Sequence, residues 1–179
     1  MYRLSRLRFL FPIGLFVAFF LDGSLSKVWA SLFFSYPYNM VSQLVLLWLV
    51  LSYFFEGNIK IPLTGFAIAV GVIADVYYAG IWGLFIVLYP LMVWLTKFLA
   101  RYFNDTFLNM ILIFFVDVAV FELLNYWAYY VIGITHANFG DFLINTLAPT
   151  LALNLAYFVL LFWPIQSLYT RALADRQRN

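Results

Sequence analysis

The 179-residue sequence contains no cysteine and a single histidine, His136. Without cysteine the chain forms no disulfide, no thiolate metal site and no cysteine nucleophile. Charged residues are also scarce, because Asp, Glu, Lys and Arg together make up 10% of the chain and the formal net charge is +2. Soluble domains carry about 25% charged residues, so the composition excludes an ordinary soluble fold.

The sequence also lacks the common catalytic and nucleotide-binding motifs. It has no G-x-S-x-G elbow, no Walker A loop and no G-x-G-x-x-G. The zinc-protease motif H-E-x-x-H needs two histidines, and the lone His136, near Asn138 and Asp141 in a loop, is weak evidence for a base or a metal site. We therefore expect no enzyme activity, no catalytic residue, no cofactor and no metal.

Apolar surface is what the chain has in abundance, since 66% of its residues are hydrophobic and 22% are aromatic. Tyr and Trp at this density are typical of membrane–water interfaces. The apolar runs are continuous, whereas the strands of a membrane barrel alternate, so we expect helices. At about 20 residues per span, the length predicts an all-α integral membrane protein. We expect one polytopic domain over 1–179, a compact bundle of about six transmembrane helices.

Basic residues predict how these helices are oriented. The predicted spans are 9–21, 39–55, 65–83, 81–96, 106–132 and 142–169. With six spans, one side holds only Lys27, and the other holds Arg3, Arg6, Arg8, Lys60, Lys97, Arg101, Arg171, Arg176 and Arg178. An excess of positive charge marks the cytoplasmic side. Both termini are therefore expected in the cytoplasm, and the first helix is expected to be retained, not cleaved as a signal peptide.

The third span carries a carboxylate, Asp75, in the middle of an apolar run. A charge at that depth costs roughly 2.5–3.5 kcal/mol on insertion scales, so it must face protein, water or a partner. In a regular helix Gly71, Asp75 and Tyr78 share one face, and Gly71 lets another helix approach closely. Gly80 and Gly83 predict a tight reversal into the fourth span.

The fifth span contains two more acids, Asp117 and Glu122, which lie on different faces of a helix. Glu122 aligns with Asn125, Tyr126 and Tyr129, a polar stripe suited to hydrogen-bond its carboxyl group. These groups either form a seam where a substrate, ion or partner helix docks, or they join the helices of one bundle. The sequence leaves both interpretations open.

In the last span, Thr150 and Asn154 form a polar pair just after the bend expected at Pro149. For this pair the structural interpretation, hydrogen bonding between helices, is favoured. A fourth acid, Asp22, is expected near the end of the first helix.

Three features of the chain resemble the rod shape-determining protein MreD family of bacteria. One is the overall plan, with a basic N-terminus, about six spans and a basic tail. Another is the segment from Pro149 to Asn154, which is similar to the family's proline-to-asparagine segment. The third is the glycine–acid–glycine pattern of the third span, made by Gly65, Gly71, Asp75, Gly80, Gly83 and Leu84.

The resemblance implies a multi-pass protein of the bacterial cell membrane that serves cell-shape maintenance and peptidoglycan synthesis. Its expected role is that of a non-catalytic scaffold or adaptor of the elongation machinery. The expected partners are an MreC-like bitopic protein, bound through transmembrane helices, and in the wider assembly MreB, RodA and a class B penicillin-binding protein. No nucleic acid is expected as a partner. The candidates for partner docking or bundle integrity are Gly71, Asp75, Gly80, Gly83, Glu122, Asn125, Pro149 and Asn154.

A function from another class fits the same outline. The substrate-binding membrane subunits of energy-coupling-factor vitamin transporters have a similar length and about six helices. In that interpretation Asp75, Glu122, Asn125 and His136 line one ligand pocket. A cavity of several hundred Å³ closed to lipid favours the carrier, whereas a lateral groove for a foreign helix favours the adaptor.

Overall fold

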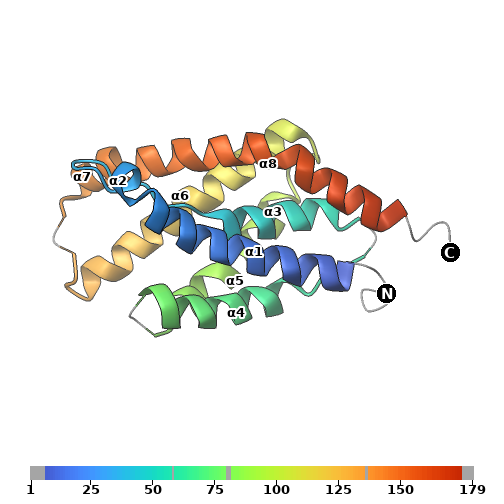
Figure 1. The fold of residues 1–179 in the computed structure, drawn as a ribbon, viewed down its shortest axis with the longest axis horizontal. Coiled ribbons are helices and arrows are strands. Elements are labelled where there is room, and N and C mark those ends of the chain that lie inside the picture. The colour runs from blue at the N-terminus through green and yellow to red at the C-terminus, as the bar shows by residue number, and fades with distance from the viewer. Residues whose placement is uncertain (1–6, 58, 80–81, 136, 175–179) are drawn as a thin grey trace.

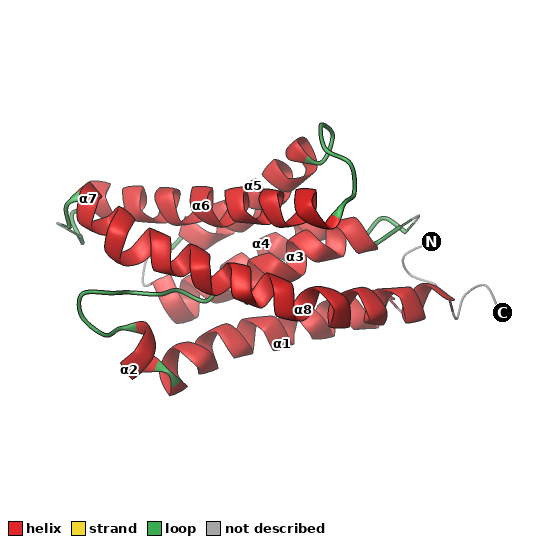
Figure 2. Cartoon of the chain, turned by 90° about the horizontal axis from the view of Figure 1, so that it is seen from above, coloured by secondary structure: helices red, strands yellow, loops and turns green. Residues whose placement is uncertain are grey.

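The structure, a computed structural model, describes residues 7–57, 59–79, 82–135 and 137–174. Within these ranges every regular element is a helix, and Figure 2 shows the helices running side by side along one axis. The predicted all-α architecture is therefore confirmed.

Within the described residues, three helical segments are long and apolar enough to cross a membrane. The first is α1 (Leu7–Val28) and the second is α6 (Phe107–Val131). The third runs from Phe139 to Ala174 and joins α7 (Phe139–Phe142), the π-helix η3 (Leu143–Leu147) and α8 (Ala148–Ala174).

Three apolar helical segments are shorter. They are α3 (Leu44–Phe55), α4 (Leu63–Ala74) with its π-helical extension η2 (Asp75–Ala79), and α5 (Leu84–Leu99). A single turn, α2 (Ala30–Phe33), follows α1. Each of the six predicted spans corresponds to one of these segments, but several predicted boundaries are wrong.

The first helix continues through Asp22 to Val28, and the second begins at Leu44 instead of residue 39. Residues 39–43 are not helical, yet Ser42 and Gln43 are buried. Non-helical backbone at membrane depth persists only where protein covers it and satisfies its polar groups. The predicted start at residue 39 was wrong because the side chains that satisfy this segment lie on other helices.

Helix α3 is the centre of the bundle. All of its residues from Leu44 to Ser52 are buried, and it packs against α1, α5, α6 and α8 (Figure 1). A helix that is apolar all round is stable only when other helices surround it, and this composition places α3 inside.

Helices α4 and α5 form a tightly packed hairpin. A Cβ atom on Gly71 would lie 2.6 Å from the carbonyl oxygen of Phe85 and 2.8 Å from the backbone nitrogen of Ile86. The close helix approach predicted at Gly71 is therefore present. Gly83, with φ of +99°, supplies the left-handed residue of the predicted reversal. Gly80, the other glycine predicted there, lies outside the described residues.

The described chain ends, Leu7 and Ala174, lie at the same end of the bundle (Figure 1). The loops that follow α3 and α5 lie at that end too (Figure 2). Lys97, near the end of α5, donates a 3.4 Å hydrogen bond to Thr64 at the start of α4, which joins these two helices at that end. This arrangement agrees with an even number of crossings.

Gly71→Ala is expected to destabilise the bundle by about 1–3 kcal/mol, because the new methyl group must displace the α5 backbone. Gly65→Ala is the matched control, since a Cβ at Gly65 meets nothing within 4 Å. Thermal unfolding of the detergent-solubilised protein measures the difference. Equal melting temperatures for the two variants would contradict the close packing of α4 on α5.

Candidate functional site

Asp75 is 2% exposed and caps the start of α5. Its Oδ2 accepts hydrogen bonds from the N–H groups of Gly83 (2.9 Å) and Ile86 (3.2 Å), and its Oδ1 accepts one from Phe85 (2.7 Å). Amides at the start of a helix have no partner within it and carry partial positive charge, so a carboxylate is well matched to them. The prediction that protein hides Asp75 is confirmed.

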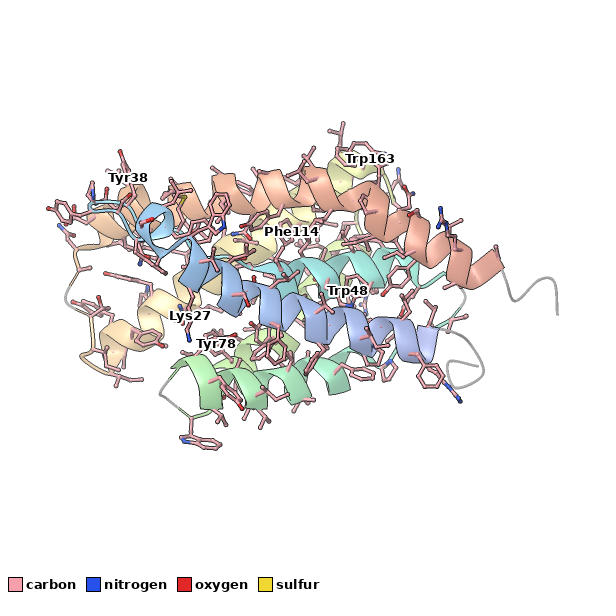
Figure 3. The ribbon with its side chains drawn as sticks, viewed as in Figure 1. Lys27, Tyr38, Trp48, Tyr78, Phe114 and Trp163 are labelled. Carbon is pink, nitrogen blue, oxygen red and sulfur yellow. The ribbon has the colours of Figure 1, made fainter. Side chains whose placement is uncertain are left out.

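Tyr78 does not share the face of Asp75, and that prediction is wrong. The Tyr78 hydroxyl donates to the carbonyl oxygen of Phe19 on α1 at 3.3 Å, and Figure 3 shows its side chain between α1 and the helix formed by α4 and η2. The prediction assumed regular α-helical spacing. Residues 75–79 instead form a π-helix, whose wider turn changes which residues align.

Asp22 of α1 caps α3 in the same manner. Its Oδ1 accepts from the Ser42 hydroxyl (2.5 Å) and the Leu44 N–H (2.8 Å), and its Oδ2 accepts from the Val45 N–H (3.0 Å). Asp22 was expected near the end of the first helix, but α1 continues past it to Val28. Asp22 was not among the predicted site residues. One signal was available: Gln43, the residue just before α3, provides no side-chain cap, so the first amides of α3 need an outside acceptor.

The polar pair of α8 holds the non-helical segment before α3. Thr150 Oγ1 accepts from the Val41 N–H (3.1 Å), and Asn154 Oδ1 accepts from the Gln43 N–H (2.9 Å). Asn154 Nδ2 also donates to the Val41 carbonyl oxygen at 2.8 Å. Thr150 is 0% and Asn154 1% exposed. These contacts let the chain enter the bundle as a non-helical segment while its backbone groups at Val41 and Gln43 are hydrogen-bonded.

Glu122 of α6, 2% exposed, accepts a hydrogen bond from Gln43 Nε2 at 2.8 Å. This partner lies on a distant segment and not on the predicted stripe along α6. Tyr126, a member of that stripe, donates instead to the carbonyl oxygen of Ala137 at 2.8 Å. Asn125 Oδ1 is buried and has no hydrogen-bond partner within the described part of the chain.

Asp117 lies apart from these groups, between α6 and α5. It is 0% exposed, and its Oδ2 accepts from the Thr96 hydroxyl at 2.6 Å. Among the described residues nothing bonds its Oδ1.

The predicted candidates thus fall into two groups. Gly71, Asp75 and Gly83 build the α4–α5 hairpin, while Glu122 and Asn154 converge on residues 41–43. Pro149 is the second residue of α8, directly after η3. Gly80 and His136 lie outside the described residues, as do the terminal arginines Arg3, Arg6, Arg176 and Arg178.

A polar cavity of about 370 Å³ opens at the end of the bundle opposite the described chain ends. It contains Glu122 and Asn125, but Asp75 does not line it. The lining residues, among those described, are Pro37, Asn39, Val41, Glu122, Asn125, Tyr126, Tyr129, Thr135, Ala137, Asp141, Phe142, Asn145 and Thr146.

Two apolar grooves flank α1. The larger, about 540 Å³, lies between α1 and α4, and the smaller, about 300 Å³, lies between α1 and α8. We call these the α1–α4 groove and the α1–α8 groove. The α1–α4 groove is lined by Pro12, Leu15, Phe16, Phe19, Phe20, Phe66, Ala69, Val70, Ile73, Tyr77 and Tyr78.

These features define a class: an all-helical, multi-pass membrane protein in which Asp22 and Asp75 cap the protein's own helix starts. A family model described as rod shape-determining protein MreD matches residues 7–172, and the chain belongs to this family. It is a protein of the bacterial cell membrane with a role in rod-shape determination, and its family is not a known enzyme family. No curated protein and no solved structure gives a significant match.

Asp75→Leu is expected to destabilise the protein by about 3 kcal/mol or more, because it leaves three amides at the start of α5 without an acceptor at about 1–3 kcal/mol each. Asp75→Asn keeps one acceptor oxygen, so a smaller loss is expected. Asp105→Asn, in an exposed loop, is the control and should change stability by less than about 0.5 kcal/mol. The free energy of unfolding in mixed detergent micelles tests this order. A Leu variant as stable as the Asn variant would disprove the capping role.

Proposed function

We propose that this chain is a non-catalytic adaptor of the cell-wall elongation machinery. In this role it binds the transmembrane helix of an MreC-like bitopic protein in the α1–α4 groove. Membership of the MreD family supports association with the shape-determining machinery in general. The described loops are short, so a partner can be recognised mainly through lipid-facing surfaces.

The observation that carries the proposal is the shape of the α1–α4 groove. Its floor is formed by the buried side chains of Leu15, Phe19 and Val70, and its rim by the exposed rings of Phe16 and Tyr77. Lipid tails are as apolar as the groove, so burial alone gives little affinity in a bilayer, and close packing must supply it. A concave apolar surface between two helices is the shape that a third helix fits.

Asp75 contributes to this proposal indirectly. All of its described hydrogen bonds are to the chain's own α5 amides, and the α4–α5 hairpin that it holds forms one wall of the groove. We therefore expect Asp75→Leu to weaken co-purification with the MreC-like partner through distortion of that wall.

The charge distribution supports the wider assembly that we propose. Lys60, Lys97, Arg101 and Arg171 belong to the end of the bundle that carries the described chain ends. By the positive-inside rule that end faces the cytoplasm, where anionic lipid and the cytoskeletal MreB would meet it. RodA and the class B penicillin-binding protein would be reached through the bitopic partner, so control of peptidoglycan synthesis is indirect.

The vitamin-carrier alternative required Asp75, Glu122, Asn125 and His136 to line one pocket. Glu122 and Asn125 do line the polar cavity, but Asp75 caps α5 elsewhere, and His136 lies outside the described residues. The placement of Asp75 and the family match both favour the adaptor.

Ala69→Trp is expected to block partner binding, because Ala69 is an exposed residue within the α1–α4 groove and an indole there fills the space that a helix would occupy. Ala156→Trp is the matched control, on an exposed position of α8 outside both grooves. Co-purification of the MreC-like partner from native membranes, with equal amounts of each variant, measures binding.

A third variant, Val17→Trp, fills the α1–α8 groove. The proposal predicts that the partner is lost only with Ala69→Trp. Retention with Ala69→Trp, or loss with Val17→Trp alone, would show that the α1–α4 groove is not the docking site.

A further inference from the structure

The polar cavity carries a negative charge pattern. Two of its lining residues are acids, Glu122, which is buried, and Asp141, which is exposed. None of the described residues that line it is Lys or Arg, and Lys27, on the same half of the molecule, lines a different cavity. Two carboxyl groups, with no Lys or Arg among the described lining residues, disfavour an anionic ligand and favour a cationic one.

Aromatic rings form part of the same wall. Tyr126 stacks on Phe142 with a centroid separation of 4.3 Å, and Tyr129 lies one helical turn after Asn125 on the same side of α6. The faces of such rings carry negative potential and attract ammonium and guanidinium groups. Rings and carboxyl groups therefore favour the same class of ligand.

Asn125 supplies an independent indication. Its Oδ1 is buried at the cavity and has no hydrogen-bond partner within the described ranges. Buried acceptors in native proteins are nearly always satisfied. Asn125 lines the cavity, so a small rotation of its amide would let this oxygen accept from an N–H donor there.

We propose that the cavity is a binding site for a small organic cation that carries an ammonium or guanidinium group. Its volume, about 370 Å³, falls within the range of about 300–1,000 Å³ that is usual for small-ligand sites. The cation is either a free amine or the ethanolamine headgroup of a membrane lipid. The cavity and the α1–α4 groove share no lining residue, so the inference is independent of partner docking.

The test uses the purified, delipidated full chain in detergent, with ethanolamine and methylguanidine as cationic probes and ethylene glycol and acetate as neutral and anionic controls. Both cations are expected to raise the melting temperature and to bind in calorimetric titrations, and the controls are not. Asn125→Leu and Asp141→Asn are expected to weaken cation binding by about tenfold or more.

Asp105→Asn, an exposed acid in the loop between α5 and α6, is the matched control and should bind as the wild type does. Asp141 is exposed, so its variant remains interpretable if Glu122→Gln fails to fold. No cation-dependent stabilisation, equal stabilisation by acetate, or wild-type affinity in both cavity variants would overturn the proposal.

Lipid nanodiscs distinguish the two sources. If phosphatidylethanolamine raises the melting temperature over phosphatidylglycerol in the wild type but not in Asn125→Leu, the headgroup is the ligand. If free ethanolamine binds equally well in both lipids, the ligand is a free amine. Either result supports the site.

Discussion

The constraint on which this fold depends is that helices starting inside a membrane protein cannot leave their first amides to water. Helix α3 begins within the bundle and α5 begins at a tight turn, and neither has a side-chain cap of its own. Asp22 and Asp75 supply the missing acceptors from the preceding helical segments. Each acid is costly in lipid, but three charge-assisted hydrogen bonds and the positive end of a helix offset that cost.

These two capping contacts also determine where the functional surfaces lie. Asp22 ties α1 to the start of the central helix, and Asp75 closes the α4–α5 hairpin. The α1–α4 groove lies between α1, which Asp22 joins to α3, and the α4–α5 hairpin. These two contacts place the groove on the lipid-facing side. At the far end, Thr150 and Asn154 hold the non-helical segment 39–43 open beside α6, and the polar cavity forms next to it. Asp22 and Asp75, rare intramembrane acids of the kind that suggests a functional site, are therefore structural groups first. The surfaces proposed for partners and ligands are built around them.

The parts of this arrangement that depend on one helix at a time could be predicted from the sequence. The continuous apolar runs indicated the helices, and the pairing of Gly71 with Asp75 indicated a buried acid beside a close helix contact. The parts that could not be predicted depend on contacts between distant segments. The hydrogen-bond partner of Glu122 is Gln43, 79 positions away in the chain, and the periodicity of α6 does not reveal this partner. Tyr78 was misplaced for a local reason, since the π-helical turn after Asp75 departs from regular spacing.

The most direct test of the capping account is hydrogen–deuterium exchange of individual amides, monitored by NMR on the wild-type protein in lipid nanodiscs. The account predicts that the amides of Leu44, Val45, Phe85 and Ile86 exchange as slowly as those in the middle of α3 and α5, because carboxylates bond them inside the protein. Rapid exchange at these four positions, as at the open start of a solvated helix, would contradict it.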